Sequence, residues 1–217
     1  MEQLQDLLKV HCHRLLNIVD YDNWVRQYFQ IPFPSYWQQV FKIANSIPRE
    51  SRVLEIGAGY GMVTSIFVYL GYLNIISYEE DATVARLGNI FMDKVFGRRD
   101  IIKPSKFNTQ SHEVDVLILV NCAYSDGCKT KEEYMRRLSA YYTLASEPEY
   151  YILEVIDSEY TQPNECFPEQ IRLSENDIRT MFPNKNIKRW KTYEYPKNKK
   201  SKTLYLIQNE ECTSYNK

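Results

Sequence analysis

The residues best suited to binding a small ligand lie in a short run that ends in three alternating glycines. Alternating glycines let a chain leave a strand through a sharp turn, and they let a ligand approach the backbone where any Cβ would collide with it. Dinucleotide-binding folds use a G-x-G-x-x-G pattern that seats a pyrophosphate on a helix N-terminus. Here the pattern is G-x-G-x-G, with an acid two residues before the first glycine. The candidate ligand residues in this run are Glu55, Gly57, Ala58, Gly59, Tyr60 and Gly61.

Two further carboxylates follow the next apolar run. Glu79 and Glu80 come directly after Ile75–Tyr78, roughly 20 positions beyond the first glycine, which is where dinucleotide folds place a ribose-binding acid. Alternatively, these acids only cap the next helix, although Asp81 can fill that role without them. The sequence therefore predicts Glu79 as a second ligand residue, with Glu80 as the fallback.

A polar segment suited to handling a second substrate follows the fourth apolar run, at residues 121–126 (Asn-Cys-Ala-Tyr-Ser-Asp). Within it, Tyr124 or Asp126 can orient or deprotonate an acceptor, and so can Glu154 or Asp157 on the fifth predicted strand. A histidine base is not expected, because the three histidines lie outside this segment, at His11, His13 and His112.

The chain offers no strong metal-binding pattern. His11-Cys12-His13 has suitable residue types, but it lies in a stretch of helical periodicity, where residues one or two apart point in different directions. Mg²⁺ needs several clustered oxygen ligands, and between residues 120 and 129 only Asn121 and Asp126 qualify. We therefore expect no metal ion, and we interpret the five scattered cysteines as reduced thiols.

Strands that alternate with helices must position these residues. Apolar runs predict seven strands, at residues 52–56, 74–78, 101–102, 114–120, 150–156, 187–195 and 203–208. Helical spacing of apolar residues fills most intervals between them, which indicates an α/β fold with a doubly wound, mostly parallel sheet. The link Pro196–Lys202 is too short for a crossover helix, so the last strand is expected to be antiparallel.

We expect a single domain over residues 1–217. Two stretches of helical periodicity before residue 49 are separated by Ile31-Pro32-Phe33-Pro34, so residues 1–49 are predicted to form a helical N-terminal extension. Residues 50–209 are predicted to form a Rossmann-like core. The chain has no internal repeat and no linker long enough to divide it.

The composition is that of a globular protein, with 217 residues, 44% of them hydrophobic, and a mean hydropathy of −0.49. The net charge of −1 gives no overall attraction to nucleic acid or membranes. No apolar run approaches the ~18 residues of a membrane span, and the N-terminus carries acids where a secretory signal carries positive charge. We therefore expect a cytoplasmic protein, and the oligomeric state is left open.

One local patch departs from this balance. Residues 185–202 contain eight Lys or Arg side chains, interleaved with aromatic residues such as Trp190 and Tyr193. The patch is either a surface for nucleic acid or phosphate, or a solvated hairpin whose lysines protect a sheet edge. We favour the hairpin.

The glycine run and the acid after the second strand together resemble motif I and its partner acid in the class I S-adenosylmethionine-dependent methyltransferases, a motif written E/D-x-G-x-G-x-G. The resemblance covers residues 50–209, the reversed last strand included. It implies S-adenosylmethionine as cofactor, held by the glycine run and by Glu79 or Glu80 at the ribose. It also implies an adenine contact after the third strand, for which Asn108 is the nearest candidate, and it puts Asn121 beside the transferable methyl group.

The resemblance implies methyl transfer, and the absence of an appended recognition domain favours a small-molecule acceptor. We expect O-methylation of a sugar or of a phosphorylated metabolite. As an alternative, Asn-Cys-Ala-Tyr at residues 121–124 resembles a degenerate N-P-P-Y element of enzymes that methylate amino groups on nucleic acid or protein. In that element the amide accepts from the target nitrogen. A third alternative is a catalytically inactive, methyltransferase-like binding subunit, which a broken glycine loop would favour; here the loop is intact.

Overall fold

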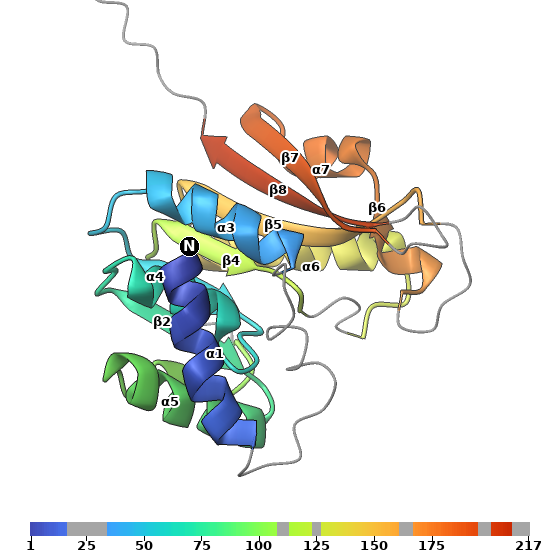
Figure 1. Ribbon diagram of the computed structural model, residues 1–217. Coiled ribbons are helices and arrows are strands. Elements are labelled where there is room, and N and C mark those ends of the chain that lie inside the picture. The colour runs from blue at the N-terminus through green and yellow to red at the C-terminus, as the bar shows by residue number, and fades with distance from the viewer. Residues whose placement is uncertain (17–33, 108–112, 123–126, 161–166, 195–200, 210–217) are drawn as a thin grey trace, which may run out of the picture.

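The computed structural model describes residues 1–16, 34–107, 113–122, 127–160, 167–194 and 201–209, arranged around one central sheet (Figure 1). Seven strands follow the order β3-β2-β1-β4-β5-β8-β7. The first five of this path pair in parallel, and β8 runs antiparallel to both β5 and β7. The predicted fold class is confirmed. The strands are β1 Val53–Ile56, β2 Ile75–Glu79, β3 Ile102–Pro104, β4 Val116–Leu119, β5 Tyr150–Asp157, β7 Lys185–Glu194 and β8 Ser201–Asn209.

An eighth strand, β6 (Arg172–Leu173), was not predicted from the sequence. It forms because β4 ends opposite Leu153, which leaves the last residues of β5 without a strand on that side. β6 pairs in parallel with Ile156 and Asp157 there. A strand of two residues has no periodicity to detect, so the prediction of seven strands was one too few.

The closing hairpin also differs from the expectation. Ser201 and Lys202 belong to β8 rather than to the link between the strands. Lys202 pairs with Ile156 of β5 on one side and with Tyr193 of β7 on the other, and its side chain is buried. Lys202 is therefore not part of an exposed basic patch.

Six α-helices and one 3-10 helix lie among the described residues, and their starts agree with the capping residues in the sequence. Asp81 accepts from the N–H groups of Thr83 and Val84, and Ser174 forms a capping box with Asp177. No helix within the described ranges combines the length and the apolar character needed to cross a bilayer. The helices are α1 Glu2–Leu16, α3 Ser35–Ser46, α4 Met62–Tyr69, α5 Ala82–Phe96, α6 Lys131–Leu144, α7 Glu175–Met181 and the 3-10 helix η2 Glu169–Ile171.

Hydrophobic residues pack on both faces of the sheet. Val116 and Ile118 of β4 join the cluster beneath α1, α3, α4 and α5, whereas Leu117 and Leu119 join the cluster beneath α6 and α7. Figure 1 shows α3 and α6 on opposite faces of the central strands. This double coverage explains why the sequence of β4 is a continuous apolar run.

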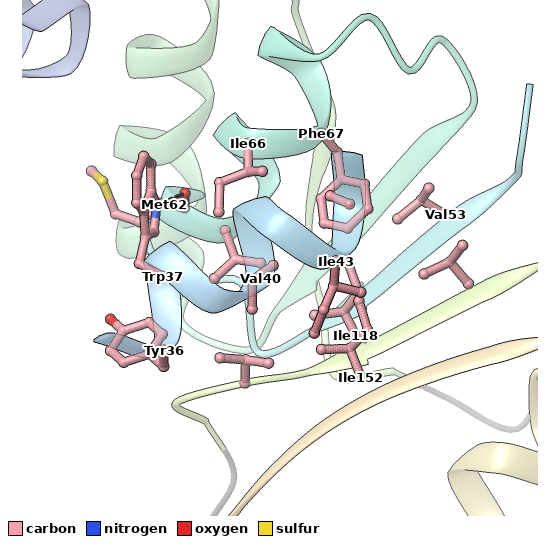
Figure 2. Packing of buried hydrophobic residues seen from close by; sticks show 14 of the residues in the cluster. Tyr36, Trp37, Val40, Ile43, Val53, Met62, Ile66, Phe67, Ile118 and Ile152 are labelled. Atoms are coloured by element: carbon pink, nitrogen blue, oxygen red, sulfur yellow. Dashed lines mark hydrogen bonds between the residues drawn. The ribbon is translucent and has the colours of Figure 1, made fainter. Parts of the chain in front are cut away.

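The N-terminal helices share their core with the sheet. Trp37 of α3 is fully buried and donates from Nε1 to the carbonyl oxygen of Met62, 2.9 Å away, at the start of α4. Figure 2 shows Trp37 and Val40 packed beside Met62 and Ile66. Leu4 of α1 is buried in the same cluster. The helical extension therefore helps to hold the elements that carry the glycine run.

Candidate functional site

The glycine run forms a tight loop between β1 and α4. Gly57, Gly59 and Gly61 all have positive φ angles, of 72°, 56° and 80°, which side-chain-bearing residues rarely adopt. The N–H groups of Gly57 and Ala58 both donate to the carbonyl oxygen of Tyr78, at 2.8 and 2.9 Å. The loop is thereby fixed to the carboxyl end of β2.

Gly57 is also required by close packing. A Cβ on Gly57 would lie 2.4 Å from Cβ of Cys122 and 2.8 Å from its Sγ. The ends of β1 and β4 therefore approach each other more closely than any other residue at position 57 allows.

Glu79 joins the loop to the end of β2. Its Oε2 accepts from the N–H of Gly59 at 2.8 Å, and its Oε1 accepts from the N–H of Asp81 at 3.0 Å. The Glu79 carboxylate thus lies against the glycine loop at the end of β2. The neighbouring Glu80 borders the same cavity.

A cavity of about 330 Å³ opens at the carboxyl ends of β1, β2 and β4. This is the edge where open α/β sheets bind their ligands, and the volume lies at the small end of the usual range for ligand pockets. Two larger hollows, of about 540 and 960 Å³, lie at the amino end of β4 and β5 and between α5 and β3, and neither touches the glycine loop. The 330 Å³ cavity is lined by Ile56, Gly57, Gly59, Tyr78, Glu79, Glu80, Ser105, Lys106, Phe107, Asn121, Cys122 and Tyr141.

Three aromatic rings form one wall of this cavity. Phe107 stands edge-on to Tyr78, with centroids 5.4 Å apart, and edge-on to Tyr141 of α6, with centroids 6.0 Å apart. Sequence reasoning missed all three residues. The only available signal was the position of Phe107 shortly after the third predicted strand, and Tyr141 looks in the sequence like an ordinary core residue of its helix.

Not every predicted ligand residue borders the cavity. Ala58 packs against Ala85, Ile101 and Ile102, and Tyr60 contacts the hydrophobic cluster of α3–α5. Gly61 serves as the N-cap of α4. These three residues support the loop on the side away from the cavity.

Glu55 lies beneath the loop on β1 and is fully buried. Its Oε2 accepts from Thr64 Oγ1 of α4 at 2.5 Å, and Thr64 Oγ1 lies 2.9 Å from Ser77 Oγ of β2. Removal from water raises the pKa of Glu55 to about 8, although the hydrogen bond from Thr64 opposes the shift. Glu55 does not line the cavity, and it ties β1, α4 and β2 together below the glycine loop.

Replacement of Glu55 by Gln is expected to remove a pH dependence of stability. The unfolded chain ionises Glu55 near its usual pKa, whereas the folded chain keeps it protonated up to about pH 8, so its contribution is present at low pH and is lost as pH rises from about 4.5 to 8. Gln cannot ionise, so Glu55→Gln should be more stable than wild type at pH 8 by roughly 3 to 5 kcal/mol, and nearly equal to it at pH 4.5. Urea unfolding at the two pH values measures this. Replacement of the exposed Glu50 by Gln is the control and should leave the pH dependence of stability unchanged. Parallel pH profiles of wild type and Glu55→Gln would contradict the prediction.

A buried polar cluster continues the site from Asn121. The N–H of Asn121 donates to Glu154 Oε2 at 3.1 Å, and Glu154 Oε1 accepts from Thr192 Oγ1 at 2.5 Å. Lys202 Nζ donates to Asn121 Oδ1 at 2.5 Å and lies 3.9 Å from Glu154 Oε2. Tyr36 of α3 accepts from Asn121 Nδ2 at 3.4 Å. The cluster therefore joins α3, β5, β7 and β8 at the end of β4.

The cluster contains two buried ionisable side chains, Lys202 and Glu154. Burial lowers the pKa of Lys202, and the nearby Glu154 carboxylate opposes that shift. Burial, reinforced by Glu55 and Glu154, raises the pKa of the Cys122 thiol well above its usual range. Cys122 therefore stays a neutral thiol, which donates to the carbonyl oxygen of Ile56 at 2.9 Å.

Several predicted site residues lie outside the described residues. Asn108, Tyr124, Asp126 and His112 belong to ranges 108–112 and 123–126, so the structure does not place them. Neither of the two cysteines whose side chains are described, Cys122 and Cys128, forms a disulfide. Across the described ranges, no three His, Cys, Asp or Glu side chains gather as a metal site would require, and independence from metal remains a prediction that a chelator tests.

No protein-family model matches this chain, and no curated protein matches it in sequence. Solved structures do match its fold. Magnesium protoporphyrin IX methyltransferase (ChlM) from Synechocystis PCC 6803 with bound SAM superposes with a TM-score of 0.62 at 17% identity, over 93% of this chain and 97% of that chain. The methyltransferase domain of bacterial CtHen1-C gives a TM-score of 0.57 at 12% identity, over 81% of this chain and 97% of that chain. The chain has the class I methyltransferase fold.

Proposed function

We propose that the chain is a cytoplasmic S-adenosylmethionine-dependent methyltransferase that acts on a small-molecule acceptor. The observation that carries this is the joint position of the glycine loop and Glu79 at one cavity: the Glu79 carboxylate lies 2.8 Å from the loop N–H of Gly59, and both residues line the cavity. A loop that only connected β1 to α4 would need neither a carboxylate nor an opening to solvent.

The residues present fit this cofactor. Gly57 and Gly59 line the cavity without side chains, and Glu79 offers carboxylate oxygens to ribose hydroxyls. The wall of Tyr78, Phe107 and Tyr141 suits a heteroaromatic base. When bound, S-adenosylmethionine supplies a methyl group that leaves sulfur without its bonding electrons and adds to a lone pair of the acceptor, which yields S-adenosylhomocysteine and the methylated acceptor.

Within this function we propose O-methylation, with a sugar or a phosphorylated metabolite as acceptor. The support is the state of Asn121, which borders the cavity. An enzyme of the amino-methylating kind uses the amide oxygen of this residue to accept from the target nitrogen, whereas in this chain that oxygen faces Lys202, which engages one of its two lone pairs. Glu79, Glu154 and the neutral thiol of Cys122 already take part in hydrogen bonds. The chief contribution of these residues is therefore to position the acceptor.

Two measurements test the proposal. Calorimetry with S-adenosylhomocysteine is expected to give saturable binding, and radiolabelled S-adenosylmethionine with a panel of hydroxyl, carboxylate and phosphate-bearing acceptors is expected to give transfer that EDTA leaves unchanged. Binding without transfer to any acceptor would favour the binding-subunit alternative. Absence of binding would refute the proposal.

A further inference from the structure

We propose that Lys202 fixes the orientation of the Asn121 side-chain amide and thereby makes the site select an oxygen acceptor over an amine. The inference rests on the methyl-transfer function proposed above, and it assigns Lys202 as a positioning residue that acts through Asn121. It concerns a residue that the sequence places in a surface hairpin but the structure places behind the cavity wall.

The orientation follows from the chemistry of the contact. Lys202 Nζ lies 2.5 Å from Asn121 Oδ1. An ammonium has three donors and no acceptor, so only the oxygen end of an amide can face it. The opposite orientation would set the Asn121 NH2 group against another donor. Because Lys202 is only 9% exposed, little water is available to relieve such a clash.

The sheet fixes the backbone of Lys202, and buried neighbours surround its ammonium. Lys202 lies in β8 between β5 and β7, and its carbonyl oxygen lies 3.1 Å from Thr192 Oγ1 of β7, whose single proton is directed to Glu154 at the shorter distance. Glu154 lies 3.9 Å from Nζ, and the Phe167 ring centroid lies 5.8 Å from it. The carboxylate offsets the charge, while its two oxygens are engaged by Thr192 and by the Asn121 backbone.

Contacts on the other side of Asn121 are compatible with this orientation, because the Tyr36 hydroxyl can accept from the amide NH2 group. Nδ2 donates to the hydroxyl of Tyr36, 3.4 Å away, and Tyr36 is buried in α3. The Asn121 backbone has a φ of 54°, and the Glu154 carboxylate holds its N–H there. Backbone, oxygen and nitrogen of Asn121 are thus each held by a different element of the fold.

This orientation discriminates between acceptor atoms. A neutral amine has one lone pair, which attacks the methyl group, so it can bind the amide only by donating N–H to the oxygen, and that oxygen faces Lys202. An oxygen acceptor keeps a second lone pair, which can accept from the NH2 end of the amide without displacing the ammonium. The methyl group then forms its new bond to oxygen as the bond to sulfur breaks, and a hydroxyl acceptor releases its proton to solvent.

The orientation can be measured without turnover. Nuclear Overhauser effects from the side-chain amide protons of Asn121, in protein labelled with ¹⁵N-asparagine and assigned by loss of the signal in Asn121→Ala, report which end faces which neighbour. We expect stronger effects to the Tyr36 ring than to the ε-methylene of Lys202. The reverse ratio would overturn the proposal.

Acceptor preference supplies the second readout, with matched alcohol, carboxylate and amine probes and radiolabelled S-adenosylmethionine. Wild type and Lys202→Arg, which keeps donors only, should prefer oxygen probes, whereas Lys202→Met should lose at least tenfold of that preference. Lys202→Met should bind S-adenosylhomocysteine within threefold of wild type, because Lys202 does not line the cavity. If Lys202→Met does not fold, Glu154→Gln/Lys202→Met removes both charges together.

The two proposals fail in different ways. Preferential methylation of amines by wild type, or retention of the oxygen preference in Lys202→Met, would refute the role of Lys202 while leaving methyl transfer intact. Failure of wild type to bind S-adenosylhomocysteine would refute the proposed function, and the amide orientation would then be decided by the Overhauser ratio alone. If no probe is methylated, the Overhauser ratio alone decides whether Lys202 orients the Asn121 amide.

Discussion

Replacement of Glu79 by Ala is expected to weaken binding of S-adenosylhomocysteine by about 10- to 150-fold, which corresponds to the 1.5 to 3 kcal/mol typical of hydrogen bonds to a charged group. The Glu79 carboxylate borders the cavity and also anchors the loop, through the Gly59 N–H at 2.8 Å. Its removal therefore loses ribose acceptors and loosens the glycine loop together. Isothermal calorimetry measures the affinity.

Glu80→Ala is the matched control, because it removes the same charge from the same cavity without touching the loop contact. Its effect should stay below threefold. Glu79→Gln should fall between wild type and Glu79→Ala, since it keeps one oxygen acceptor. A large loss in Glu80→Ala with none in Glu79→Ala would assign the ribose to Glu80 instead.

Replacement of Gly57 by Ala is expected to destabilise the protein by roughly 2 to 5 kcal/mol. A left-handed backbone costs an L-residue about 1 to 2 kcal/mol, and overpacking of a core adds about 1 to 3 kcal/mol. The overpacking arises because the new Cβ would lie 2.4 Å from Cβ of Cys122. Urea unfolding measures the loss, and affinity for S-adenosylhomocysteine should fall with it because Gly57 lines the cavity.

Gly71 provides the control for backbone strain alone. Its φ is 91°, and a Cβ there would meet no atom within 4 Å, so Gly71→Ala should cost only the left-handed conformation. Cys122→Ala keeps the clashing Cβ and should not rescue Gly57→Ala, whereas Cys122→Gly should. Equal losses in Gly57→Ala and Gly71→Ala would mean that the approach of β1 to β4 does not constrain position 57.

Much of the fold could be predicted because its strands and helices carry strong periodicity. The run of β4 is apolar throughout since both its faces are covered, and the capping residues before α5 and α7 mark helix starts locally. β6 could not be predicted, because it exists only where β4 stops short along β5. Likewise, no pattern near residue 107 signals that Phe107 will meet Tyr141 across the cavity.

Part of the candidate site could likewise be predicted from the sequence, and part could not. The proximity of the glycine loop and Glu79 at one cavity could be predicted, because their residue types and spacing are those of two adjacent strand ends. Lys202 was grouped with neighbouring lysines as part of a surface hairpin, since its burial depends on pairing with β5 and β7 rather than on its own surroundings in sequence. A lysine in a basic stretch gives no local sign that its partner is Asn121.

The two ends of the cavity are completed at different stages of chain synthesis. Gly59 and Glu79 are separated by 20 positions, whereas Asn121 is 85 positions from Tyr36 and 81 from Lys202. Bringing distant positions together costs more chain entropy and has to await the later residue. A growing chain therefore contains Gly59 and Glu79, the residues proposed to hold the cofactor, well before Lys202 is synthesised. If Lys202 orients Asn121 as proposed, selection of the acceptor is the last property of the site to form during synthesis.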